Sequence, residues 1–110
     1  MIITLTGSSR FLMAYDYWND RLSFDGNLVF SYVPLIAENR DMTLLQLIQK
    51  WKIAKSDLLF VIDCASLVDM QSYIGQHTKE QIDFATAANM TIVYASNVLI
   101  KRSSIKLGEE

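Results

Sequence analysis

Short apolar runs rich in β-branched residues alternate along this chain with segments whose apolar side chains recur at helical spacing. The runs cover residues 1–6, 28–33, 58–62 and 91–95, and the tail from residue 97 could hold one more strand or helical turn. The segments of helical spacing begin near Phe11, Leu44 and His77. Continuous apolar strands that alternate with helices are typical of a parallel sheet covered on both faces. The pattern therefore predicts an α/β three-layer sandwich with a parallel sheet of four or five strands.

The length and composition are those of one folded domain, which we expect to span residues 1–110. Of the 110 residues, 51% are hydrophobic and 20% are charged, which is enough for one modest core. The net charge is −2 and no stripe of Lys and Arg is visible, which argues against a nucleic-acid partner. The apolar runs are far shorter than the roughly 20 residues of a membrane-spanning helix, so we expect no membrane partner.

The chain has one cysteine and one histidine. A single cysteine cannot form a disulfide within the chain, and it fits the reducing cytoplasm, where we expect the protein to act. These two residues cannot build a metal site of histidine or thiolate ligands, so we expect no metal, and no motif indicates a cofactor. Cys64 follows an apolar strand and has no evident histidine partner in the sequence, which favours a structural role.

Three segments that follow strands are candidates for a binding site, because ligands of such sheets bind beyond the carboxyl ends of the strands. The first segment, Gly7-Ser8-Ser9-Arg10, links the first strand to the first helix. Its backbone amides, hydroxyls and guanidinium suit an anion such as phosphate. Ser8 or Ser9 could equally be only the N-cap of the helix.

The other two candidate segments come after the third strand. Asp63 ends the most hydrophobic strand, where its carboxylate could bind ribose hydroxyls, orient a catalytic group, or be only a solvated strand end or a cap. Gly75-Gln76-His77-Thr78 opens the third helix, and the amides of a helix start favour a negative group. Thr78 is either a ligand-facing hydroxyl or the N-cap. His77 is either a polar residue of the helix start or a catalytic base.

Five aromatic residues have positions that bear on the core or the site. Phe11, Trp18, Trp51 and Phe84 lie at helical spacing, and we expect them to be mostly core residues. Tyr73 lies two residues before the third candidate segment, and it could stack on a base or cover the core.

Four segments, in order along the chain, carry a resemblance to a known family. Residues 5–11, LTGSSRF, are similar to the opening L-C-G-S-T-R-F of its members, and residues 22–29 to L-T-L-E-G-N-I-V. Residues 52–62 resemble K-I-D-L-A-D-E-I-F-V-I, and residues 73–85 resemble Y-I-G-E-S-T-R-R-E-I-E-Y-A. The family comprises the nucleoside 2-deoxyribosyltransferases and related short bacterial and phage proteins. The resemblance implies a flavodoxin-like, Rossmann-like fold and a homodimer or higher homo-oligomer.

The family's chemistry depends on a glutamate that attacks the anomeric carbon and so cleaves the N-glycosidic bond of a deoxynucleoside. Related hydrolases act on nucleoside monophosphates, whose phosphate is held by serine-rich turns and helix starts. In the register fixed by Thr78, Ile82 and Ala85, the glutamate falls on Gln81, whose amide is neutral and poorly nucleophilic. Glu80 lies about 100° further around the helix, so it should point elsewhere.

The resemblance therefore implies a protein that binds a nucleoside, a nucleotide or an ADP-ribose-like molecule without turning it over, and that could sequester a nucleotide signal. The family serine is replaced by His77, and a family histidine of the second helix falls on Gln49. The expected ligand-binding residues are Gly7, Ser8, Ser9, Arg10, Asp63, Gly75, His77, Thr78 and Gln81. The catalytic residue stays unassigned. One alternative is an N-glycosidase or deoxyribosyltransferase that uses Glu80, Asp63 or an activated water, and another is an interaction domain whose pocket has decayed.

Overall fold

The computed structural model describes residues 1–31 and 42–100. The elements are β1 (Ile2–Gly7), the 3-10 turn η1 (Ser9–Phe11), α1 (Leu12–Phe24), β2 (Leu28–Phe30), α2 (Met42–Ala54), β3 (Leu58–Ile62), α3 (Gln76–Ala87) and β4 (Thr91–Tyr94). Residues 95–100 are helical. The four strands form one parallel sheet in the order β2-β1-β3-β4. The prediction of an α/β fold with a parallel sheet is confirmed, and the strand number among the described residues is four.

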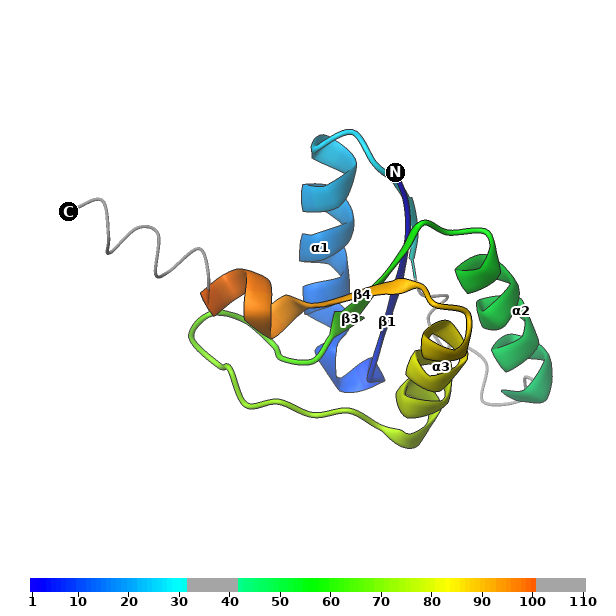
Figure 1. Cartoon of the computed structure of the whole chain (residues 1–110). Helices are drawn as coiled ribbons and strands as arrows, with labels where there is room; N and C mark the ends of the chain where they lie inside the picture. The colour runs from blue at the N-terminus through cyan, green and yellow to red at the C-terminus, as the bar shows by residue number, and fades with distance from the viewer. Residues whose placement is uncertain (32–41, 101–110) are drawn as a thin grey trace.

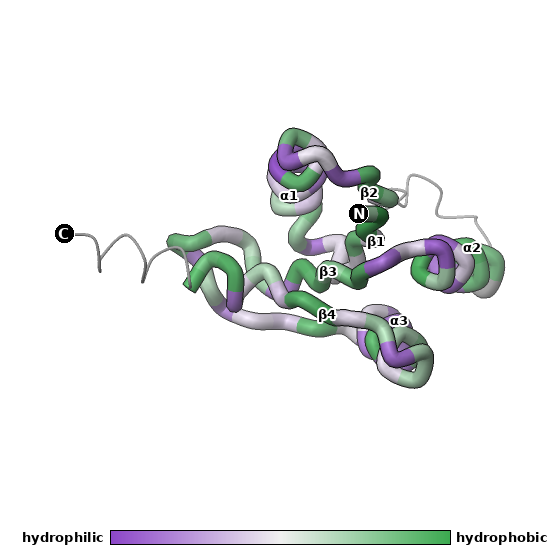
Figure 2. Tube along the Cα trace, turned by 45° about the horizontal axis from the view of Figure 1, so that its top comes forward, coloured by the Kyte–Doolittle hydropathy of each residue, from purple (hydrophilic) through white to green (hydrophobic). Residues whose placement is uncertain are grey.

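The sheet is covered on both faces. α1 lies on one face, and α2 and α3 lie on the other (Figure 1). On the α1 side, Ile3 and Leu5 of β1 pack with Trp18 and with β3 residues such as Phe60. Figure 2 shows the same separation of α1 from α2 and α3 after a turn of the molecule. The fold is therefore the three-layer arrangement that the alternating runs predict, and it is flavodoxin-like or Rossmann-like, as the resemblance implies.

The first and third helices end through the same local device. Gly26 follows α1 with a φ of 93°, its N–H donates to the Ser23 carbonyl at 3.0 Å, and the Asn27 N–H donates to the Leu22 carbonyl at 3.2 Å. These bonds satisfy carbonyls at the helix end and require a residue that tolerates the left-handed region. Asn89, with a φ of 55°, occupies that position after α3. Both turns return the chain directly to the amino end of a strand.

The bounds of three strands differ from the sequence predictions. β1 covers Ile2–Gly7, one residue later at each end than the predicted run of residues 1–6. β2 ends at Phe30, Ser31 is not part of the strand, and residues 32 and 33 of the predicted run lie outside the described residues. The predicted fourth strand is one residue too long, because helix starts at residue 95. Asp63 explains this start: its Oδ1 accepts the Ser96 N–H at 2.9 Å and its Oδ2 accepts the Ser96 hydroxyl at 2.6 Å. A carboxylate that accepts these bonds stabilises a helical turn there.

One aromatic core prediction is wrong. Phe11 and Trp18 are buried, but Trp51 is 59% exposed. The residues of α2 that face the sheet are Gln49 and Ile53, which are 7% and 0% exposed. The apolar stripe of α2 that contains Trp51 therefore faces outward, and periodicity alone did not show which face of this helix meets the sheet.

In residues 1–31 and 42–100, no helix has the length and the apolar character needed to cross a membrane.

Candidate functional site

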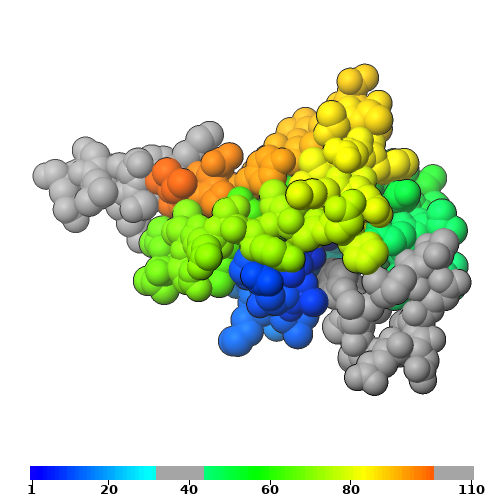
Figure 3. All heavy atoms as spheres, turned by 90° about the horizontal axis from the view of Figure 1, so that it is seen from below, coloured from blue at the N-terminus to red at the C-terminus, as the bar shows by residue number. Residues whose placement is uncertain are grey.

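A cavity of about 260 Å³ lies beyond the carboxyl ends of the central strands. From β1 the chain first adds β2 on one side and later β3 on the other, so strand order reverses beside β1. Such a reversal is where ligands of open α/β sheets bind. The cavity wall comes from residues 6–9, from α2, and from the segment that leads into and starts α3. Figure 3, seen from below, shows the residues after β1 (blue) against the segment after β3 (yellow-green).

Gly7 brings the turn after β1 close to β3. It pairs with Ile62, and a Cβ added at Gly7 would lie 2.5 Å from the Ile62 carbonyl oxygen. Real side chains do not make such a contact, so only glycine fits here without a shift of the backbone. The Tyr15 hydroxyl of α1 donates to the Gly7 carbonyl at 2.9 Å and holds the turn from the opposite face. The turn after β1, which forms part of the cavity wall, is therefore held by close contacts to the backbone of Gly7.

The start of α3 faces the same cavity. Gly75 is the N-cap and has no side chain with which to cap the helix, and Lys79 makes the first backbone bond, to the Gly75 carbonyl at 3.0 Å. The N–H groups before Lys79 therefore have no acceptor within the helix, which makes this end attractive to an anion or a hydroxyl. Thr78 lines the cavity and is 4% exposed, and its hydroxyl bonds to no described residue. It lies within α3, so the alternative that it is the N-cap is wrong.

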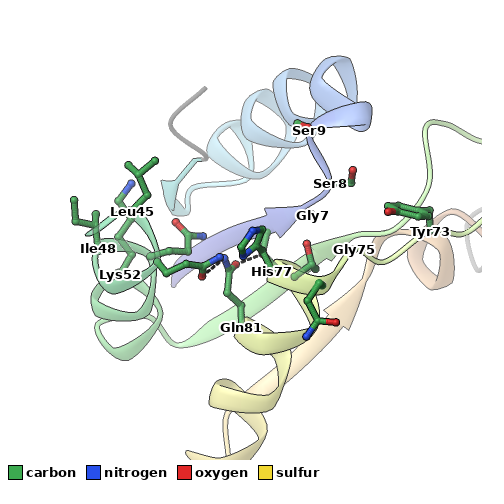
Figure 4. A pocket seen from close by; sticks show the side chains of 15 residues that line it. Gly7, Ser8, Ser9, Leu45, Ile48, Lys52, Tyr73, Gly75, His77 and Gln81 are labelled. Carbon is green, nitrogen blue, oxygen red and sulfur yellow. Dashed lines mark hydrogen bonds between the residues drawn. The ribbon is translucent and has the colours of Figure 1, made fainter. Parts of the chain in front are cut away.

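Gln81 also lines the cavity, and its carboxamide is held at both ends. The Thr6 hydroxyl donates to Gln81 Oε1, and Gln81 Nε2 donates to Gln46 Oε1 at 3.2 Å (Figure 4). Gln81 is 7% exposed. At the position that the resemblance aligns with a catalytic glutamate, this chain therefore has a buried, hydrogen-bonded amide.

Lys52 of α2 supplies a positive charge to the cavity wall. Its Nζ lies 3.5 Å from the Ser31 carbonyl oxygen, and burial lowers the pKa of its amine. Among the described residues that line the cavity there is no Asp and no Glu. The cavity is therefore neutral to positive although the chain as a whole carries a charge of −2.

The structure brings together seven of the nine ligand-binding residues predicted from the sequence. The residues that line the cavity are Gly7, Ser8, Ser9, Gly75, His77, Thr78 and Gln81. Ser8 also caps η1, since its hydroxyl accepts the Arg10 N–H at 3.3 Å, so the capping alternative holds for this serine.

Arg10 and Asp63 are the two predicted ligand residues that do not line the cavity. The Arg10 guanidinium lies over the ring of Tyr73, 3.6 Å from its centroid, in cation–π contact. Both carboxylate oxygens of Asp63 are bound to Ser96, so its alternative as a cap is the one observed. Glu80, an alternative catalytic residue, is exposed and lies outside the wall, which agrees with its expected direction. Tyr73 itself lines the cavity.

Several lining residues were not singled out from the sequence, and these include Thr6, Gln46 and Lys52. Gln49 was noted only as the position of a family histidine, and its Nε2 donates to the Leu5 carbonyl at 3.0 Å. One signal was present in the sequence. The first strand alternates apolar and hydroxyl side chains, which indicates that one of its faces meets polar groups.

No group of three His, Cys, Asp or Glu residues that could hold a metal ion occurs in the described part of the chain. Comparison of the chain with protein-family models, with curated protein sequences and with solved structures finds no match.

Proposed function

We propose that this protein binds a nucleoside or a nucleotide and does not transfer its sugar, as a relative of the nucleoside 2-deoxyribosyltransferases that acts in the cytoplasm. The sequestering of a nucleotide signal would be the corresponding biological role. The observation that carries the proposal is the cavity at the strand-order reversal, with an amide at Gln81 where the resembled enzymes carry a glutamate. The anion-attracting start of α3 and the positive charge of Lys52 support a ligand with a phosphate or other acceptor oxygens.

The lack of a carboxylate in the described wall argues against covalent sugar transfer. A nucleophile for the anomeric carbon must be anionic and must leave again from the ester it forms. Gln81 cannot do this, Asp63 is bound to Ser96, and Glu80 points to solvent. We thus propose a binding protein that has the sugar site of the resembled enzymes but lacks their nucleophile.

The cavity volume favours a small ligand. About 260 Å³ lies just below the roughly 300–1,000 Å³ that is usual for ligand pockets. A nucleoside or a mononucleotide suits this space better than a dinucleotide-sized ligand such as ADP-ribose.

The deciding experiment is native mass spectrometry of the protein after incubation with a mixed pool of nucleosides and nucleotides. We expect an intact nucleoside or nucleotide to be retained, and the released small molecules to identify it. A free base together with a sugar or sugar phosphate would contradict the proposal, because it would mean turnover. A protein that retains nothing from the pool would contradict binding itself.

A Gln81→Glu variant tests whether the missing carboxylate is what separates this protein from the enzymes. We expect the wild type to release no base from deoxynucleoside monophosphates, and the variant to gain slow release. Gln76→Glu is the matched control, since it adds the same charge to the cavity rim at the start of α3. Release by the control as well would show that position 81 is not special.

We also propose that the protein forms a homodimer or a higher homo-oligomer through α2. The exposed apolar stripe of this helix consists of Leu44, Leu47, Ile48 and Trp51, which are 55%, 59%, 41% and 59% exposed. Their spacing forms one stripe on one helix face, as in helices that pack against a partner. Light scattering after size-exclusion chromatography tests this, and a monomer at high protein concentration would contradict it.

A further inference from the structure

Lys52 lies at one end of the cavity with Leu45 and Ile48, whereas Ser8, Ser9 and Tyr73 lie at the other end (Figure 4). Its ammonium group has three donors and no acceptor. Among the described residues, the hydrogen-bond partner of its Nζ is the Ser31 carbonyl, at the long distance of 3.5 Å. Two of the three donors therefore have no partner in the described part of the chain.

The surroundings of Lys52 favour an oxygen of the ligand as the missing partner. The amine is half-buried, and no carboxylate of the described cavity wall balances its charge. Burial lowers the pKa of this amine, which means that its charged form is disfavoured where it stands. An oxygen that carries partial or full negative charge would compensate it.

Gln49 stands next to Lys52 as a hydrogen-bond acceptor. The two residues are three positions apart on α2 and thus share one helix face. A carbonyl can only accept, so the bond to the Leu5 carbonyl fixes Gln49 Nε2 on that side and determines the orientation of the amide. Gln49 Oε1 then has no donor among the described residues. This end of the cavity presents a donor group, Lys52, beside an acceptor, Gln49 Oε1.

Nucleobases with an exocyclic oxygen match this pair of groups. Hypoxanthine and uracil carry a carbonyl oxygen beside a ring N–H, so the oxygen can accept from Lys52 while the N–H donates to Gln49. Adenine and cytosine carry an amino group beside a bare ring nitrogen, which is the opposite order. In the same placement an amino base sets donor against donor and acceptor against acceptor, and a site with such unpaired buried groups rejects the mismatched ligand.

We propose that Lys52 and Gln49 make this cavity selective for nucleosides and nucleotides whose base carries an oxo group, over those with an amino group at the same position. This inference rests on the proposed function and assigns Lys52 as its specificity residue.

The test is isothermal titration calorimetry with two matched pairs of probes: inosine monophosphate against adenosine monophosphate, and uridine monophosphate against cytidine monophosphate. In whichever pair binds, we expect the oxo member to bind roughly tenfold to a hundredfold more tightly, as for a charge-assisted hydrogen bond that is made or lost. Equal affinities within each binding pair, or tighter binding of the amino member, would overturn the inference and leave the proposed function standing. Failure of all four probes to bind would overturn both.

Three variants assign the preference to its residue. Lys52→Met keeps an unbranched side chain only one atom shorter and removes the donors, so we expect the preference to disappear. Lys52→Arg keeps the charge and the donors, so we expect the preference to persist. Its persistence would show that the site tolerates a substitution at this position and still folds. Lys55→Met is the matched control, because Lys55 is exposed, follows α2 directly and lies near Trp51. A preference that survives in Lys52→Met would overturn the assignment.

Discussion

The two faces of β1 are built from alternate residues of the same strand, and they meet very different surroundings. On the α1 side, Ile3 and Leu5 pack into the larger apolar cluster. On the side of α2 and α3, Thr4 is hydrogen-bonded to Ser56 and to the Lys52 carbonyl, and Thr6 is hydrogen-bonded to Gln81. Both threonines are buried. Apolar side chains can fill space by contact alone, whereas polar ones must be paired, so the second face keeps a network and a cavity where the first is filled.

This difference separates the residues that hold the fold together from those that form the site. Neither Ile3 nor Leu5 of the apolar face lines this cavity, whereas Thr6 of the other face lines it directly. Substitutions on the two faces should therefore affect stability and binding in different proportions.

The largest effect is expected from Trp18→Ala on the apolar face. Trp18 is 2% exposed and its ring lies 4.8 Å from that of Phe60, centroid to centroid. We expect a loss of about 3–5 kcal/mol in the free energy of unfolding, measured by urea denaturation. Phe24→Ala is the control, and because Phe24 is 89% exposed its cost should stay within about 0.5 kcal/mol. Similar losses in the two variants would contradict the burial of Trp18.

Gly7→Ala tests the close approach of the carboxyl ends of β1 and β3, where Gly7 pairs with Ile62. The new Cβ would fall 2.5 Å from the Ile62 carbonyl oxygen, so the strand ends must move apart. We expect a loss of about 1–3 kcal/mol in urea denaturation, together with weaker ligand binding in calorimetry. Gly75→Ala is the comparison, because a Cβ there meets only the Tyr73 ring at 3.6 Å or more. An unchanged Gly7→Ala protein would contradict the close approach of β1 and β3.

Thr6→Val tests the polar face with almost no change in side-chain shape. It removes the donor to Gln81 Oε1, so we expect a loss of about 1 kcal/mol in urea denaturation. We also expect Thr6→Val to weaken ligand binding. This loss of affinity should be larger than the loss measured for the folded fraction of Trp18→Ala. Thr91→Val, at an exposed position of β4, serves as the control. A Thr6→Val protein more stable than the wild type would mean that this face gains from being apolar.

The smallest effect is expected from Lys52→Met in the absence of ligand. Burial holds the pKa of Lys52 below its ordinary value of 10.5, so the charged form is less favourable in the folded than in the unfolded chain. That penalty is present at neutral pH and is relieved as the pH rises through the folded pKa toward the ordinary one. We expect the variant to gain at most about 0.5 kcal/mol near neutral pH and to lose this gain by about pH 10.5.

Urea denaturation at the two pH values measures the gain. Lys55→Met, at an exposed position, is the matched control. A gain in Lys52→Met that grows with rising pH would have the wrong sign for a buried cation.

The contrast between the faces also explains how far the sequence could predict the molecule. Continuous apolar runs such as residues 58–62 determine strands through burial, so the fold class and the strand-end location of the site followed from local patterns. Gly7 and Gly75 marked segments that do line the cavity. These predictions depend on the hydrophobic pattern and the glycines of each segment, and both can be seen in the sequence itself.

The wrong predictions concern which partner a side chain finds. Asp63 was a candidate for ribose, but Ser96, from a distant part of the chain, takes both of its oxygens. Trp51 was expected in the core, but α2 turns its glutamines and Lys52 toward the polar face of β1 instead. Which of several distant side chains a residue contacts is determined by packing in three dimensions. A local sequence pattern does not predict it.

The position of β1 between β2 and β3 has a consequence for synthesis on the ribosome. Of the four described strands, β1 emerges first and is an interior strand, and its second edge stays open until Leu58 and the residues after it pair with Ile3 and its neighbours. Contacts between such distant segments close slowly, and an open strand edge can pair with other chains meanwhile. The cavity forms later still, because it needs Gln81. The site thus belongs to nearly the whole length of the chain, and no amino-terminal fragment that stops short of α3 contains it.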